Sequence, residues 1–173
     1  GLLHAQTPVA DPVALPRIAP TPPERALATF QVKPGFRLEL IAAEPNVVDP
    51  VAMSFDEAGR MYVVEMIGYS ERREEALDRI RLLEDRNRDG VYETSTVFAD
   101  GLKWPTGVTC SHGGVYVVAS PDLLFLKDTD GDGIGDWRHG IDNALVPEHC
   151  GDGGSRVWST DLHTGRTESS DAS

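Results

Sequence analysis

Short segments in which apolar and polar residues alternate make up most of this chain. A period of two, with β-branched and aromatic residues between turns rich in glycine and aspartate, is typical of β-strands. The predicted strands are residues 36–42, 51–55, 60–66, 79–83, 94–99, 107–110, 115–120 and 123–126. Helical periodicity is almost absent, so the sequence predicts an all-β fold.

The N-terminal part departs from this pattern. Residues 6–23 contain six prolines, and proline disfavours both helices and central strands, so we expect an extended linker. Thr21, Pro22 and Glu24 then have the spacing of a helix start, with Thr21 as the cap and Pro22 at the first helical position. One short helix ending near Phe30 is predicted.

One arrangement of strands occurs twice. Residues 62–64 and 116–118 both read Tyr-Val-Val, 54 positions apart, whereas two acidic loops lie 43 positions apart. A long solvated connection at 67–78, where the second copy has only residues 120–122, accounts for the difference. The further matches are Pro50 with Pro105 and Met53 with Val108. Four antiparallel strands repeated at this interval predict an incomplete β-propeller of about two blades. A β-sandwich built from meanders is the alternative.

In a blade whose strands run up and down, the connections divide between two ends. The turn between the first and second strands shares one end with the loop between the third and fourth. The acidic loops are therefore expected at that end. The connections at 65–78, 99–107 and 120–122 are expected at the opposite end.

Oxygen-bearing side chains alternate along both acidic loops. Alternate side chains of a tightly curled loop can point at one centre, and calcium binds six to eight oxygens. Gly90 and Gly133 occupy the sixth position, where the chain must turn sharply. The predicted ligands are Asp85, Asn87, Asp89 and Glu93 in the first loop and Asp128, Asp130, Asp132 and Asp136 in the second. We expect structural calcium, because neither loop carries an evident base or nucleophile.

These loops differ from EF-hands, which place a bidentate glutamate at position 12. That position holds Thr96 in the first loop and His139 in the second. Each loop can instead be interpreted as a turn stabilised only by hydrogen bonds to its own backbone. Arg86 and Arg88 offset part of the charge of the first loop, so the second is the stronger calcium candidate.

Acidic residues outnumber basic ones, 28 to 16, which gives a net charge of −12. This charge opposes binding to nucleic acid and to anionic membrane surfaces. No apolar run reaches the roughly 18 residues of a transmembrane segment. Residues 2–5 are typical of the end of a signal peptide cleaved after Ala5, with an arbitrary start as the alternative. Whether Cys110 and Cys150 pair is left open.

Residues 24–140 resemble a known family. The segment PGFRLELIAAEPNVVDPVAMSFDEAGRMYVVEMIGY (34–69), with residues 79–108 and 121–136, is similar to the N-terminal domain of the PVC-type membrane-bound dehydrogenases. The resemblance implies an exported β-propeller like that of the glucose/sorbosone dehydrogenases, which use pyrroloquinoline quinone (PQQ). A heme-binding CxxCH domain often follows in that family. This chain contains no CxxCH motif, so no heme is expected in it.

The resemblance divides the chain into three parts. Residues 1–23 are a signal-peptide remnant and linker, and residues 24–140 are propeller blades. Residues 141–173 form a polar tail that departs from the family and is expected to be disordered. We therefore expect an incomplete propeller, from a truncated or frame-disrupted reading.

The resemblance also implies a function. The chain would be the N-terminal portion of a periplasmic or cell-surface oxidoreductase that oxidises sugars or alcohols with PQQ and calcium. Electrons would pass to a cytochrome c domain of the full-length protein, and this portion alone would be inactive. The alternatives are a non-catalytic, calcium-stabilised propeller module that binds carbohydrate or protein, and a remnant without function.

A quinone dehydrogenase needs a base for the substrate hydroxyl and cations for the carboxylates of the cofactor. We seek both at the end opposite the acidic loops. The candidates there are Glu65, Tyr69, Arg72, Arg73, Trp104, Thr106 and Asp122. Alternatively, the aromatic residues pack sheet edges and the arginines are solvated. The histidines lie elsewhere, and no catalytic residue is assigned.

Overall fold

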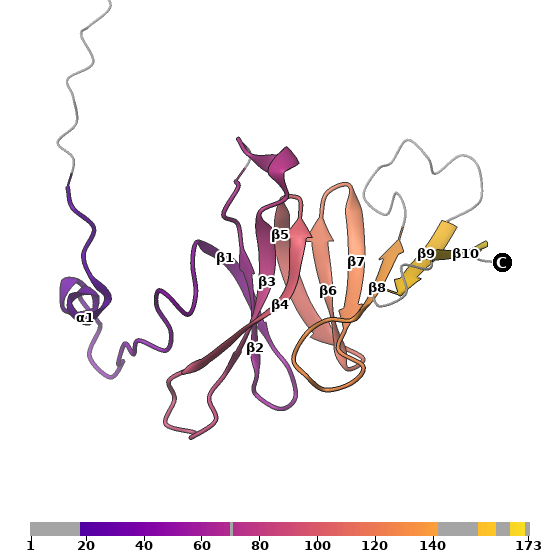
Figure 1. Ribbon diagram of the computed structural model, residues 1–173. Helices are drawn as coiled ribbons and strands as arrows, with labels where there is room; N and C mark the ends of the chain where they lie inside the picture. Colours follow the sequence, from indigo (N-terminus) through magenta and orange to yellow (C-terminus); the bar gives the residue numbers. More distant parts are fainter. Residues whose placement is uncertain (1–17, 70, 142–155, 162–166, 172–173) are drawn as a thin grey trace, which may run out of the picture. The chain divides into compact units, whose positions relative to one another are not determined.

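A computed structural model describes residues 18–69 and 71–141, together with the backbone of two further strands at 156–161 and 167–171 (Figure 1). The chain divides into two units, residues 1–38 and 39–173, and each is described by itself. No helix in the described part is long and apolar enough to cross a membrane.

The first unit contains the predicted short helix. Helix α1, Pro23–Ala26, continues into the 3₁₀ turn η1, Leu27–Thr29. The predicted cap is wrong, because the helix begins one residue later, after Pro22, and no side chain caps it. Proline already lacks the backbone N–H that a cap would otherwise satisfy.

The second unit is built from antiparallel strands, as the sequence predicts. The first sheet has the order β1-β2-β3-β4 and the second the order β10-β9-β8-β7-β6-β5. The strands of the first sheet are β1 (Pro50–Phe55), β2 (Met61–Glu65), β3 (Asp78–Glu84) and β4 (Thr94–Leu102). Those of the second are β5 (Pro105–Ser111), β6 (Gly114–Ala119), β7 (Asp122–Lys127), β8 (Trp137–Ile141), β9 (Arg156–Asp161) and β10 (Thr167–Asp171).

Three sequence expectations need comment. The strand predicted at 36–42 is wrong, because these residues pair with no described strand, and alternation alone cannot supply a partner. The connection 67–78 contains a short 3₁₀ turn, η2 (Arg73–Glu75). Strands β9 and β10 fall in the polar tail, where none was predicted. The rest of that tail lies outside the described residues, and its expected disorder stays a prediction.

The register confirms the internal repeat. In the first sheet Pro50 pairs with Glu65, and in the second Pro105 pairs with Ala119. A bulge follows each proline, and the ladder then resumes with Ala52 opposite Val64 in one sheet and Gly107 opposite Val118 in the other. The two copies therefore share the same irregularity as well as the same strand order.

The main core lies between the two sheets. Alternate side chains of β2 and β3 pack against alternate side chains of β6 and β7, and Phe98 of β4 joins them. The members with the least exposure are Val64, Ile80, Leu82, Phe98, Leu102, Val115, Val117 and Leu126. The rings of Tyr62 and Phe98 meet edge to face, with centroids 5.0 Å apart. Burial raises the pKa of the Tyr62 hydroxyl to about 12, so it stays protonated at neutral pH.

We call the surface of the first sheet that faces away from this core its outer face. Met61, Val63 and Leu83 lie there, each at most 3% exposed, because Ile41, Ala42, Val47 and Tyr92 pack over them. Strand β2 is consequently buried on both sides. The rest of the outer face, along β1, is open.

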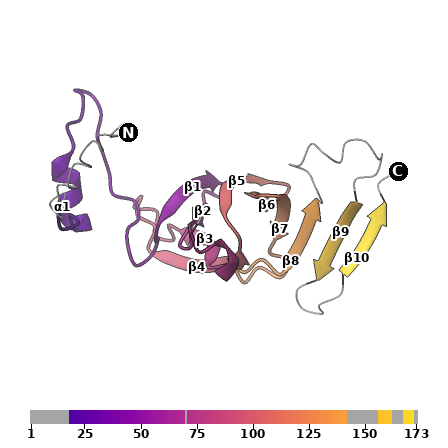
Figure 2. The ribbon, with the colours of Figure 1, turned by 90° about the horizontal axis from the view of Figure 1, so that it is seen from above.

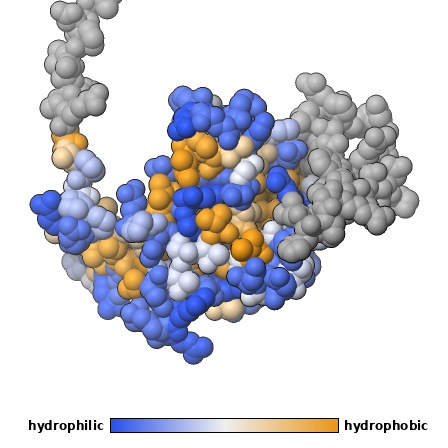
Figure 3. Space-filling model, viewed as in Figure 1, coloured by the Kyte–Doolittle hydropathy of each residue, from blue (hydrophilic) through white to orange (hydrophobic). Residues whose placement is uncertain are grey.

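The two sheets are arranged as a fan. Seen from above, β1 and β5 lie side by side, and the sheets diverge toward β4 and β8 (Figure 2). On the face shown in Figure 3, hydrophilic residues gather over both ends of the sheets and apolar residues lie between them. The connections at these two ends carry the candidate chemistry.

Phe98 tests how strongly the fold depends on contact between the sheets. It is 1% exposed and belongs to the shared core. The Phe98→Ala substitution is expected to lower the free energy of unfolding by about 3–5 kcal/mol, because it removes apolar contacts and leaves a cavity. Urea unfolding followed by tryptophan fluorescence measures the change. Phe36→Ala is the control, because Phe36 is 75% exposed; an equal loss there would contradict the assignment.

Candidate functional site

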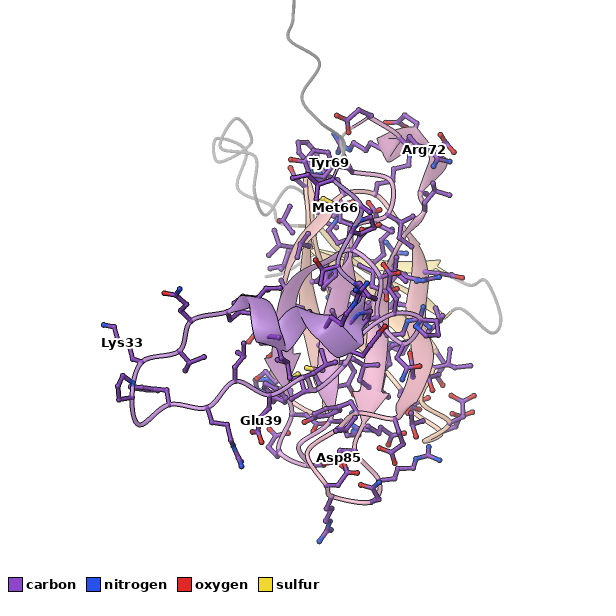
Figure 4. All side chains as sticks on the ribbon, turned by 90° about the vertical axis from the view of Figure 1, so that its left-hand side faces the viewer. Lys33, Glu39, Met66, Tyr69, Arg72 and Asp85 are labelled. Atoms are coloured by element: carbon purple, nitrogen blue, oxygen red, sulfur yellow. The ribbon has the colours of Figure 1, made fainter. Side chains whose placement is uncertain are left out.

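The candidate residues separate to the two ends of the sheets. The loops 85–93 and 128–136, which we call the first and second acidic loops, lie at one end (Figure 1). Figure 4 shows Asp85 at that end, and Tyr69 and Arg72 beyond the strands at the other. Contacts between connections agree with this division: the Tyr92 hydroxyl donates to the Gly59 carbonyl, 2.9 Å, at the acidic end.

The two acidic loops share four internal hydrogen bonds. The first-position carboxylate accepts from the N–H of the sixth residue at 2.9 Å in both loops. The third accepts from the fifth, the fifth from the seventh, and the ninth from the second. With the donor named first, the pairs in the first loop are Gly90–Asp85, Asp89–Asn87, Val91–Asp89 and Arg86–Glu93. In the second loop they are Gly133–Asp128, Asp132–Asp130, Ile134–Asp132 and Thr129–Asp136.

This pattern explains the glycine at the sixth position. Gly90 has φ +92° and Gly133 has φ +86°, a region that residues with a side chain rarely adopt. The turn there aims the N–H back at the first carboxylate. Such bonds are those of a turn stabilised by its own backbone, and they also hold the oxygens of one loop together.

The second acidic loop brings three predicted metal ligands together. One carboxylate oxygen from each of Asp128, Asp130 and Asp132 lies within 4.8 Å of the others. Asp136 is positioned by Thr129, whose N–H and hydroxyl both donate to it. A cluster of hard carboxylate oxygens on a curled loop fits calcium in charge and donor type.

The first acidic loop is a weaker cation site. Its third position is Asn87, whose amide donates to Asp89 at 3.1 Å and so occupies one of that residue's oxygens. The Arg86 guanidinium, which pairs with Glu84, also places a positive charge beside the carboxylates of this loop. The same turn is therefore present in both loops with different charge.

The second acidic loop also binds the two sheets to each other. The Gly135 N–H donates to the Phe98 carbonyl of β4 at 2.7 Å. A cleft of about 520 Å³ lies alongside, lined by Asp100, Asp132 and Arg138 among others. Burial lowers the pKa of Arg138. Order in this loop is consequently coupled to packing between the sheets.

Glu65 lies on the outer face of the first sheet, where it is completely buried. It forms ion pairs with Arg79 and Arg81 of β3, and its Oε1 accepts from the Val48 N–H at 2.7 Å. Glu65 therefore acts as a clamp between β2, β3 and the segment before β1, and presents no oxygen to solvent.

Asp78 is a buried carboxylate that the sequence reasoning missed. It is 1% exposed and accepts from the Gly68 N–H at 2.7 Å and from the Trp104 N–H at 3.0 Å. It thus joins the connection 67–78 to the turn between β4 and β5. Its place at the end of a charged segment gave no signal, because only the fold buries it.

The other candidates lie at the end opposite the acidic loops. Tyr69 is 58% exposed. The Arg73 guanidinium lies 5.5 Å from the centre of the Trp104 ring and donates to the Ser120 carbonyl. Asp122 begins β7 and is half-buried. These residues form a polar rim with one cation–aromatic pair.

Cations at this end are largely neutralised. Arg72 pairs with Glu75 at 2.6 Å and Lys103 with Glu74 at 2.7 Å. The Nε of Arg73 is buried without a hydrogen-bond partner among the described residues. A quinone with several carboxylates needs several available cations, and the described residues do not supply that set. Cys110 is a free thiol on β5, and Cys150 lies outside the described residues.

Comparison with known proteins gives one family. A model of a domain of unknown function, DUF7133, matches residues 22–146. No curated protein matches the chain. The matched residues include both acidic loops, the Glu65 clamp and Asp78.

Removal of the Glu65 charge tests its structural role. Glu65→Gln leaves Arg79 and Arg81 without their buried anion, and we expect a loss of about 3 kcal/mol of stability. Chemical denaturation of the variant and the parent measures it. The matched control is Glu75→Gln, whose ion pair is exposed and should have little effect on stability. Equal stability of the Glu65 variant and the parent would contradict the clamp.

Proposed function

The chain belongs to the DUF7133 family, and from its repeated sheets and acidic loops we propose that it is a calcium-stabilised part of a β-propeller. The observation that carries this proposal is the second acidic loop. It gathers three carboxylates and donates a backbone hydrogen bond to the neighbouring sheet. Calcium there would stabilise the contact between two blades.

The fan of sheets supports a propeller rather than a sandwich. Blades of a propeller are four-stranded sheets arranged radially around a channel. Here the first strands of both repeats, β1 and β5, lie side by side while the later strands diverge. The facing sheets share one core, and each repeat begins with the same proline and bulge. In a β-sandwich of two unrelated sheets, the two sheets would have no reason to begin with the same proline and bulge.

Calcium would act through mass action on the folded state. A ligand that binds only the folded protein stabilises it by about 2.7 kcal/mol at a concentration 100 times its Kd. The net charge of −12 makes a divalent cation favourable near the carboxylates, because it relieves their mutual repulsion. In this proposal the ion is structural, and the ligands are Asp128, Asp130, Asp132 and Asp136.

We expect calcium to raise the melting temperature relative to the same protein in chelator. Asp132→Asn keeps the oxygen that accepts from Ile134 but loses one charge, so it should abolish most of the rise. Asp89→Asn, at the equivalent position of the first loop, is the matched control and should retain most of it. Differential scanning calorimetry with calcium, magnesium and chelator makes the comparison. Equal melting temperatures in calcium and chelator would reject a structural ion.

The resemblance to quinone dehydrogenases gives a second candidate function, an exported oxidoreductase of which this chain is a part. The observation in its favour is Arg73, whose Nε is buried without a described partner. The described residues supply neither the remaining cations nor an accessible base: Glu65 and Asp78 are both buried and hydrogen-bonded. In this proposal the present residues form scaffold, and PQQ would supply the hydride or electron chemistry when bound elsewhere in a longer protein.

A dye-reduction assay separates the two functions. A longer DUF7133 protein reconstituted with PQQ and calcium should reduce an artificial electron acceptor in the presence of a sugar or alcohol. This 173-residue chain should not, because its described carboxylates are held in structural contacts. If the longer protein shows no reduction but binds glycans, the module function is favoured. Reduction by the present chain alone would contradict the scaffold assignment.

A further inference from the structure

The segment before β1 contacts the first sheet as β4 contacts the second. In the second acidic loop, the N–H of the eighth residue, Gly135, donates to Phe98 of β4 in the preceding sheet at 2.7 Å. In the first acidic loop the eighth residue is Tyr92, and its N–H donates to the Ile41 carbonyl at 2.8 Å. Ile41 therefore stands to the first sheet as Phe98 stands to the second.

The end of this segment repeats the end of β4. Trp104 connects β4 to β5 with φ +54°, and Asp49 precedes β1 with φ +45°. Positive φ is uncommon for residues with a side chain, so its occurrence at both positions is a second mark of equivalence. Pro105 and Pro50 follow directly, and each begins a strand with a bulge. Residues 39–49 thus lead into the first sheet as β4 leads into the second.

The apolar surfaces agree with this equivalence. Val115, Val117 and Leu126 of the second sheet are buried against the first sheet. Their equivalents, Met61, Val63 and Leu83, are covered by the segment containing Ile41, Ala42 and Val47, with Tyr92. That segment covers only part of the outer face.

The remainder is an apolar groove of about 340 Å³ between this segment and β1. Its lining includes Ile41, Val47, Val51 and Met53. Val51 is 49% exposed, Met53 59% and Phe55 49%. Three neighbouring exposed apolar residues on one strand mark an interaction surface. At the equivalent place, the second sheet receives the inner strands of the first.

We infer that this groove and the segment 39–49 together are a docking site for three antiparallel strands of another unit of this repeat. The segment would add to the free edge of those strands as the fourth strand, which accounts for the alternation of apolar and polar residues at its start. The occupant would present alternate aromatic and β-branched side chains, as Tyr62, Val64 and Ile80 do toward the second sheet. The inference rests on the proposed blade arrangement and not on calcium.

The test supplies the missing unit within the chain. A second copy of residues 50–93, which holds three strands and an acidic loop, is inserted between Gly35 and Phe36 of the full chain. In the parent protein the amides of residues 40–42 should exchange rapidly with deuterium, because no described strand pairs with them. In the extended protein their exchange should slow by at least about 100-fold, as in a hydrogen-bonded sheet. Mass spectrometry of the unique peptides covering 36–49 measures it.

The control is the same insertion with Val64→Asp and Leu82→Asp in the inserted copy only. These changes place charges on the face that would enter the groove, so residues 40–42 should exchange as rapidly as in the parent. Slow exchange only in the unmodified insertion supports the docking site. Rapid exchange in it, whether or not the inserted residues fold, overturns it, and slow exchange in both proteins does the same. Calcium melting of the parent chain tests the loop proposal separately.

Discussion

Packing of one repeated sheet onto the next is the interaction on which this structure depends. The faces in contact are unlike: β2 and β3 contribute one set of alternate side chains, and β6 and β7 contribute the opposite set. Such a contact has a direction, because each unit offers one face to its predecessor and another to its successor. Successive side chains of a strand point to opposite faces, so a strand with apolar residues at successive positions can be buried on both faces, as β2 is from end to end. As a result, β2 has almost no residue exposed to solvent.

Polar groups are buried where this packing would otherwise leave backbone or charge unpaired. Glu65 balances two arginines and receives the N–H of Val48, and Asp78 receives two N–H groups from connections that approach from different strands. Carboxylates suit this work because one side chain can accept several hydrogen bonds. The same chemistry at an open site would suggest catalysis. Here both residues are at most 1% exposed, and their carboxylates are occupied by these hydrogen bonds and ion pairs. We therefore interpret them as residues that hold irregular segments in place.

The repeat was predictable because local sequence alone favours the strands and turns of each copy. Three features favour a particular backbone conformation without help from distant residues: the Tyr-Val-Val segments, the prolines that begin β1 and β5, and the glycines of the acidic loops. Burial of Glu65 and Asp78 was not predictable, since a charged residue at a strand end is normally solvated and only the partner elements bury it. Residues 36–42 show the opposite failure: their alternation is that of a strand, but a strand exists only when another strand accepts its hydrogen bonds. Local pattern therefore predicted the strands and their repeat better than it predicted which elements lie beside each other.

The directional contact explains why the two acidic loops have diverged in charge while keeping their hydrogen bonds. In both loops the eighth residue must reach back to the preceding element, Ile41 in one case and Phe98 in the other, so the turn itself is constrained. The ligand charges are not constrained by that bond. The second loop bridges two full sheets and concentrates carboxylates, whereas the first bridges a sheet to a single segment and has an amide and neighbouring arginines instead. In the proposed calcium site, the ion would rigidify the turn at the larger of the two interfaces, which is where the three clustered carboxylates lie.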